Sequence, residues 1–203
     1  MRGPAGGLLL LALAAASACT AAPAPAPVLV DGFEDSDAWQ ARPADGVELT
    51  VGMDAGVHGR ALRLDFRFVK GGGYAVIHRD VSFDLPENYR FRFRVRGDCP
   101  PENLEFKLVD SSRANVWWSN QRDFRFPTEW DSVTLKKRKI GFAWGPAGGG
   151  EIRHVGAIEF AVTAGSGGMG TVWLDDLTLE ELPPPQAAPP APRARATSAR
   201  PGH

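Results

Sequence analysis

The side chains best suited to holding a ligand are three tryptophans, Trp117, Trp118 and Trp144. An indole face packs against the C–H patches of a sugar ring, while charged and amide groups hydrogen-bond the sugar hydroxyls. Because successive residues of a strand point to opposite faces, we expect Trp117 and Trp118 to lie on opposite sides, one in the core and one outside. Trp144 precedes Gly145 and Pro146 and is expected at a sheet edge. Each tryptophan could equally be an ordinary core residue.

Charged residues that alternate with apolar ones would supply the hydrogen bonds to such a ligand. The candidates are Arg92, Arg94, Glu105, Lys107, Asp110 and Glu159. The arginines of 90–96 would repel one another alone, so neighbouring strands are expected to supply acids, with Glu105, Asp110 and Glu159 as the expected partners. The alternative for each is a salt-bridged, solvated exterior.

Two of these acids, Glu105 and Glu159, would also be the carboxylate pair of a glycosidase or lyase. Glycoside hydrolysis needs two carboxyl groups ~5 to 9.5 Å apart, flanking the scissile bond. Nothing in the sequence marks either one for a raised pKa, and no Ser-His-Asp or zinc-protease signature is present. We therefore expect a non-catalytic segment, although a longer parent protein could be a carbohydrate-active enzyme.

The elements that must position these side chains are β-strands. Leu62, Leu64, Phe66 and Phe68 alternate with charged residues, and the same period of two recurs over 89–96, 104–108 and 158–162. Strands at roughly ten-residue spacing, separated by Gly, Pro and Asp/Asn clusters, predict an all-β, two-sheet antiparallel β-sandwich. Each strand has one apolar face for the core and one charged face for solvent.

The N-terminus predicts export. Arg2 precedes an apolar run over 8–16 that is too short to span a bilayer, and small residues follow up to Cys19. This box resembles a bacterial lipobox, with Cys19 as the lipidated mature N-terminus, although ordinary cleavage after Ala18 or near Ala22 is the alternative. The expected location is therefore a cell-envelope lipoprotein or a secreted protein, and the membrane is reached only through the lipid anchor.

Changes in amino-acid composition along the sequence divide the chain into four parts. Residues 1–18 are the expected signal peptide, 19–27 an Ala/Pro linker, 28–182 the folded domain, and 183–203 a Pro/Ala-rich tail without acidic or aromatic residues. The net charge of −1 leaves no field that would attract nucleic acid, so the basic run at 136–139 is interpreted as a solvated face.

Three segments carry a resemblance to a known architecture. The opening VLVDGFEDSDAW and the closing GTVWLDDLTLEEL resemble the first and last strands of galactose-binding-like jelly rolls. The middle, from GYAVIHRDVSF to SSRANVWW, resembles the family 11 carbohydrate-binding modules and their relatives, including the domain of complex I intermediate-associated protein 30. The resemblance implies a module that binds a polysaccharide or glycan on a sheet face. A cell-surface scaffold that binds protein is the alternative.

The same resemblance implies a structural calcium ion between the first and last strands. Glu34 and Asp175 match the ligand positions of the family, and backbone carbonyls are expected from the loop at 53–57. Calcium takes six to eight such hard oxygens. The alternative is that Asp175 and Asp176 merely end a strand.

The tail carries a second resemblance. RARATSARPGH is similar to the start of a coagulation factor 5/8 type C (discoidin) domain. It implies a discoidin or catalytic domain downstream in a longer protein.

Overall fold

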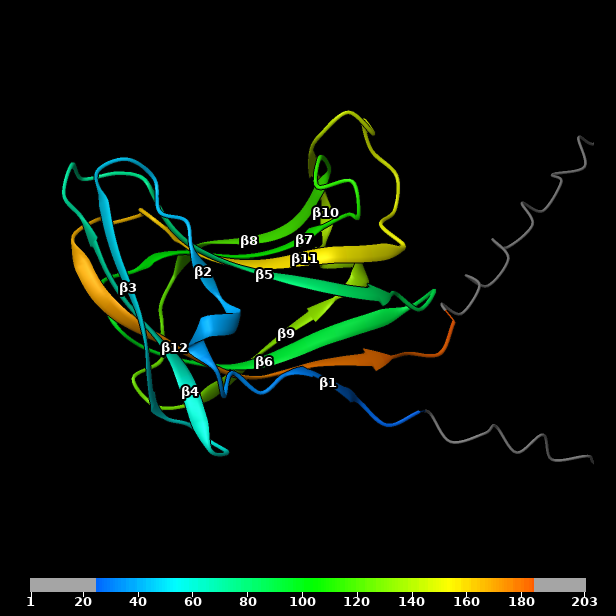
Figure 1. The fold of residues 1–203 in the computed structure, drawn as a ribbon, viewed down its shortest axis with the longest axis horizontal. Helices are drawn as coiled ribbons and strands as arrows, with labels where there is room; N and C mark the ends of the chain where they lie inside the picture. Colours follow the sequence, from blue (N-terminus) through cyan, green and yellow to red (C-terminus); the bar gives the residue numbers. More distant parts are fainter. Residues whose placement is uncertain (1–24, 185–203) are drawn as a thin grey trace, which may run out of the picture.

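The computed structural model describes residues 25–184, which form two antiparallel sheets packed face to face (Figure 1). Sheet A has the order β3-β4-β12-β6-β9, with β1 also paired to β12, and comprises β1 (Val28–Asp31), β3 (Val47–Ala55), β4 (Arg60–Phe68), β6 (Tyr89–Asp98), β9 (Asp131–Lys136) and β12 (Met169–Glu181). Sheet B has the order β10-β8-β7-β11-β5-β2 and comprises β2 (Gln40–Ala41), β5 (Tyr74–Asp84), β7 (Glu102–Val109), β8 (Val116–Phe124), β10 (Gly141–Trp144) and β11 (His154–Thr163).

Helical structure in the described residues is limited to two short 3-10 turns, η1 (Ser36–Ala38) and η2 (Lys137–Lys139). Neither has the length or apolar composition of a membrane-spanning helix. The predicted two-sheet antiparallel β-sandwich is confirmed. Residues 1–24 and 185–203 lie outside the described part of the chain, and with them the predicted signal peptide, Cys19 and most of the tail.

The alternation of apolar and charged residues produces the core. On β6, Tyr89, Phe91, Phe93 and Val95 are all buried, and the arginines between them face outward. Between the sheets, the ring of Phe160 lies 5.0 Å from that of Phe93. Edge-to-face aromatic contacts of this kind add to the burial of apolar area. The core thus fixes which side of each sheet faces solvent.

The arginines of β6 find their neighbours within sheet A. Arg90 donates two hydrogen bonds of 2.7 Å to Glu180 on β12. Arg92 and Arg94 lie opposite hydroxyl residues of β9, Thr134 and Ser132. The prediction that acids at 105, 110 and 159 are the partners is wrong, because strand pairing puts those residues on or beside sheet B.

Candidate functional site

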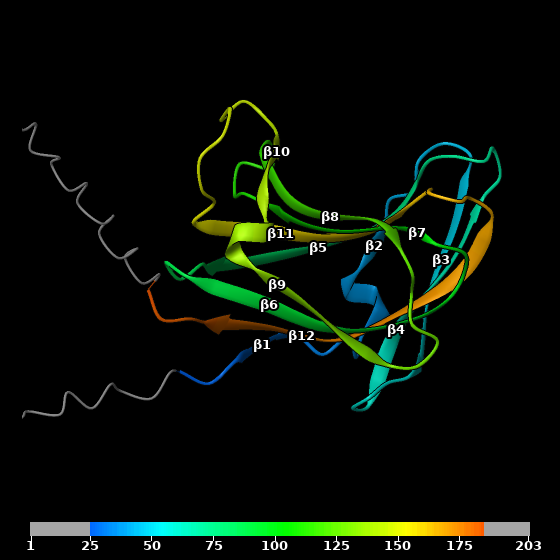
Figure 2. The same cartoon turned by 180° about the vertical axis from the view of Figure 1, so that it is seen from behind.

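One row of cross-strand neighbours crosses the outer face of sheet B. In register from one edge to the other, the row runs through Gln40, His78, Glu159, Lys107, Trp118 and Gly141. Because directly opposed residues share a face, their side chains stand on one surface. Figures 1 and 2 show that β5, β11, β7 and β8 form one layer of the sandwich, with β8 turning upward towards β10.

An aromatic pair stands at one end of the row. Trp118 is partly buried, whereas Trp144 on the edge strand β10 is 47% exposed. Their rings meet edge to face, with centroids 5.6 Å apart and an angle of 80° between the planes. Lys107 Nζ lies 5.6 Å from the centre of the Trp144 ring. The pair therefore presents an indole surface that is held in place by its neighbours.

Trp117 takes the opposite direction. It is buried in the core, and its indole N–H donates a 2.8 Å hydrogen bond to the carbonyl of Gly150. The structure thus separates the two adjacent tryptophans as strand geometry requires, with Trp118 outside and Trp117 inside.

Charged groups occupy the floor beside the tryptophans. Lys107 Nζ lies 3.1 Å from Glu105 Oε2, and the side-chain amide of Asn120 donates to Glu105 Oε1 at 3.2 Å. Both members of the Lys107–Glu105 pair are buried in the sheet surface. These contacts hold the two charged side chains in fixed positions, where they could hydrogen-bond a ligand hydroxyl.

The other half of the floor is built around His78. Its Nδ1 lies 2.9 Å from Glu159 Oε1, and its Nε2 lies 3.0 Å from Asp80 Oδ1. Arg113, from the loop after β7, also donates to Asp80. The hydrogen bonds from Arg113 and His78 hold the pKa of Asp80 below its ordinary value.

Two adjoining hollows lie over this floor, with volumes of about 580 and 420 Å³. Trp144, Arg42 and Glu159 line both, so the exposed tryptophan stands between them. The basic and acidic side chains that line the two hollows are equal in number: Arg42, Lys107 and Arg113 against Asp80, Glu105 and Glu159. We call this surface the groove. Its charge is balanced, and it offers donors and acceptors beside aromatic faces.

The structure brings together only part of the predicted binding set. Trp118, Trp144, Glu105, Lys107 and Glu159 share the groove. Arg92 and Arg94 do not, because β6 belongs to sheet A and their side chains face the other side of the sandwich. Asp110 follows the end of β7, where it accepts hydrogen bonds from Asn115 and Ser112 and orders the turn.

The sequence analysis missed several residues that line the groove, among them Arg42, Tyr74, His78, Asp80 and Arg113. Three of them share one face of β5, and their two-residue spacing was the available signal. Arg42 and Arg113 come from loops, which strand alternation does not reach.

The two acids considered as a catalytic pair are both engaged. Glu105 is bound by Lys107 and Asn120, and Glu159 by His78. These contacts hold both carboxylates in place on the floor of the groove.

The two predicted metal ligands approach a single turn at the other sheet. Both carboxylate oxygens of Glu34 accept from the backbone N–H of Arg60, at 3.2 and 3.0 Å. Asp175 Oδ2 accepts from the N–H of Val57 at 2.6 Å, and Asp175 is completely buried. Burial raises the pKa of Asp175, against the lowering effect of its backbone hydrogen bonds.

The carboxylates of Glu34 and Asp175 would supply only some of the six to eight oxygen ligands that a calcium ion takes. Within residues 25–184, no Lys or Arg pairs with Glu34 or Asp175, and no cluster of three His, Cys, Asp or Glu side chains is placed to hold a metal. A Cβ on Gly56 would lie 2.6 Å from Asp175 Oδ2 and from the carbonyl oxygen of Arg60, so only glycine allows this close approach. A cation here would offset the cost of the buried carboxylate.

Comparison with known proteins rests on the fold. No protein-family profile matches the sequence, and no curated protein matches it. The family 11 carbohydrate-binding module of the cellulosomal cellulase Lic26A-Cel5E of Clostridium thermocellum has a TM-score of 0.61 at 13% identity, over 79% of this chain and 97% of that one.

Two further solved structures show the same arrangement. A family 11 module from Clostridium thermocellum, in complex with a β-1,3-1,4-mixed-linked tetrasaccharide, has a TM-score of 0.62 at 13% identity, covering 76% and 95% of the two chains. An exo-β-agarase has a TM-score of 0.53 at 12% identity over 77% of this chain and 26% of its own. Residues 25–184 therefore have the β-sandwich fold of the family 11 carbohydrate-binding modules, which they resemble in structure.

Proposed function

We propose that this chain is a non-catalytic carbohydrate-binding module of an exported protein, and that the groove on sheet B binds a neutral polysaccharide. The observation that carries the proposal is the Trp118–Trp144 pair beside the Lys107–Glu105 ion pair on one face. Sugar rings need an apolar face and fixed hydrogen-bonding groups together, and the groove provides both.

The fold comparison supports the class of ligand. One similar structure is a complex with a β-1,3-1,4-mixed-linked tetrasaccharide, so this sandwich accommodates an extended sugar chain in that protein. In the present chain, the two adjoining hollows on either side of Trp144 favour an oligosaccharide over a single sugar. The balanced charge favours neutral sugar units.

Retention on a glycan gel tests the proposal. We expect the wild-type chain to be retarded in affinity electrophoresis on mixed-linked β-glucan, with a dissociation constant of roughly micromolar to millimolar. Trp144→Ala removes the most exposed indole face. The loss of about 1–3 kcal/mol of contact energy would weaken binding about 5- to 150-fold.

Trp130→Ala is the matched control, because Trp130 contacts Arg96 of sheet A and lies away from the groove. This variant is expected to bind as the wild type does. If the wild-type chain is retained by no member of a broad panel of neutral glycans, the carbohydrate proposal fails and a protein-binding scaffold takes its place. Release of reducing sugar would contradict the non-catalytic assignment.

A further inference from the structure

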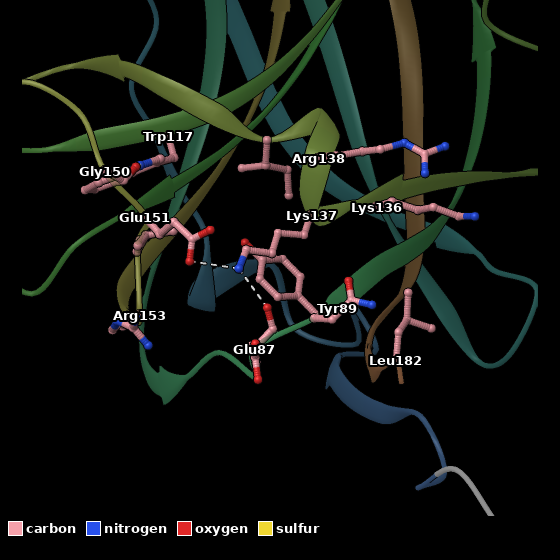
Figure 3. Close-up of a pocket in the computed structure, with 13 residues that line it drawn as sticks. Glu87, Tyr89, Trp117, Lys136, Lys137, Arg138, Gly150, Glu151, Arg153 and Leu182 are labelled. Atoms are coloured by element: carbon pink, nitrogen blue, oxygen red, sulfur yellow. Dashed lines mark hydrogen bonds and ion pairs between the residues drawn. The ribbon is translucent and has the colours of Figure 1, made fainter. Parts of the chain in front are cut away.

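A second hollow lies at one end of the sandwich, away from the groove. It has a volume of about 870 Å³ and lies between the η2 turn, the β5–β6 turn and the segment at 150–153 (Figure 3). Its lining includes Tyr89, Ile140, Ile152 and Leu182, so the walls are partly apolar. Pockets that hold ligands typically have volumes of about 300–1,000 Å³, so this hollow is large enough to bind one.

The charge of this end hollow differs from that of the groove. Four basic residues line it, Lys136, Lys137, Arg138 and Arg153, against two acids, Glu87 and Glu151. The basic run that the sequence analysis interpreted as a solvated face therefore borders a hollow. An excess of positive charge around a concave site concentrates anions there.

One of the four cations is already engaged. Lys137 Nζ lies 2.8 Å from Glu151 Oε2 and donates to the carbonyl of Glu87 at 2.7 Å, as the dashed lines in Figure 3 show. The hydrogen bond from Lys137 lowers the pKa of Glu151, so this acid is ionised and its charge is offset at neutral pH.

The other three cations are open to a ligand. Lys136, Arg138 and Arg153 are exposed, and none forms an ion pair within residues 25–184. Tyr89 also lines the hollow, and although the residue is buried its side chain carries a hydroxyl group. Lysine and arginine bind carboxylates and sulfates through charge-assisted hydrogen bonds.

We propose that this end hollow is a second binding site that takes an acidic sugar, a uronate or a sulfate ester, as part of a glycan. The choice of a sugar rests on the proposed function; the choice of an anion rests on the three open cations.

Calorimetry with the full chain tests this site, with trigalacturonate as the probe and its methyl ester as the uncharged analogue. At low ionic strength the wild type is expected to bind trigalacturonate, to lose affinity as salt is added, and not to bind the ester. The triple variant Lys136→Gln/Arg138→Gln/Arg153→Gln is expected to lose at least roughly tenfold in affinity, which is the loss of one charge-assisted contact.

Two control variants separate this site from the groove. Arg92→Gln/Arg94→Gln removes two positive charges from the outer face of sheet A and is expected to leave trigalacturonate binding unchanged. Trp118→Ala/Trp144→Ala is expected to abolish retention on neutral β-glucan and to keep trigalacturonate binding. If the wild type binds trigalacturonate but not neutral β-glucan, the proposed function of the groove is wrong. If it binds neutral β-glucan but not trigalacturonate, the proposal for the end hollow is wrong.

Four outcomes would overturn the proposal. The first is that the wild type does not bind trigalacturonate, and the second is that the Arg92/Arg94 control loses as much affinity for it as the triple variant does. The third is that the tryptophan variant loses affinity for trigalacturonate, and the fourth is that inorganic sulfate binds as tightly as the sugar. Binding to vesicles that contain phosphatidylglycerol, without binding to trigalacturonate, would instead assign the basic hollow to a membrane surface.

Discussion

Individual side chains in this protein differ sharply in their chemical accessibility. Cys99 is a clear case, because burial, with smaller contributions from the acids at 102 and 98, raises the pKa of its thiol to about 12. Thiolate is the reactive form of cysteine, so the folded protein protects this residue from disulfide exchange at neutral pH.

Thiol labelling checks this prediction. In a Cys19→Ser variant, Cys99 is the only cysteine. At pH 8 its reaction with a disulfide reagent is expected to be on the order of a thousandfold slower in the native protein than in denaturant, because an unfolded thiol has a pKa of about 8.5. Rapid labelling of the native protein would contradict the assignment.

Asp80 gives a pH-dependent prediction. Its pKa is lowered in the folded state by Arg113 and His78. A lowered folded pKa contributes stability above the ordinary carboxyl pKa of about 4, and this contribution is lost as the pH falls through the folded value. Asp80→Asn is therefore expected to unfold more easily than the wild type at pH 7, and the difference is expected to vanish in acid.

Denaturant titrations at several pH values measure the effect. Asp45→Asn is the control, because Asp45 is exposed and forms no ion pair or side-chain hydrogen bond within residues 25–184. A difference for Asp80→Asn that does not change with pH would show that the lost interaction is not one of charge.

At the scale of strands, the sequence predicted faces well and neighbours poorly. The two-residue period of β6 and β7 correctly separates core from outward residues. It cannot say that Arg94 and Lys107, both expected on polar faces, belong to opposite sheets. That assignment depends on pairing between distant segments, such as β12 with both β4 and β6.

For the same reason, only part of the candidate site could be predicted from the sequence. Strand geometry was enough to place Trp117 and Trp118 on opposite faces. The His78 network was not foreseen, because its partners come from β11, from β5 itself and from the loop after β7. Contacts of this kind exist only once three segments have met.

The predicted calcium site lies at the turn between β3 and β4. We propose that a cation binds where Glu34 and Asp175 face this turn. A ligand that binds only the folded state stabilises it by mass action, so EDTA is expected to lower the melting temperature and added CaCl₂ to restore it.

Variants at the two acids check the site. Glu34→Gln and Asp175→Asn are expected to melt at a temperature that no longer responds to EDTA. Glu48→Gln, on the outer part of β3, is expected to keep the response. An unchanged melting temperature of the wild type, in a preparation shown to be free of metal, would exclude the ion.

At the scale of the whole molecule, we propose export and attachment through Cys19. This proposal rests on the sequence of residues 1–19. Globomycin treatment or Cys19→Ala is expected to leave an unprocessed or unanchored protein, which fractionation and N-terminal sequencing would detect. Normal processing of the variant, with a mature N-terminus beyond residue 19, would reject lipidation and leave ordinary secretion.

The pairing of β1 with β12 has a mechanical consequence. Val28 lies opposite Leu179, so the two ends of the folded region are neighbours (Figure 1). A force that pulls these ends apart would open the β1–β12 ladder like a zipper, one hydrogen bond after another, which resists less than shearing a whole ladder at once. Sheet B shares no strand with that ladder. The groove would therefore keep its shape under tension while β1 yields first.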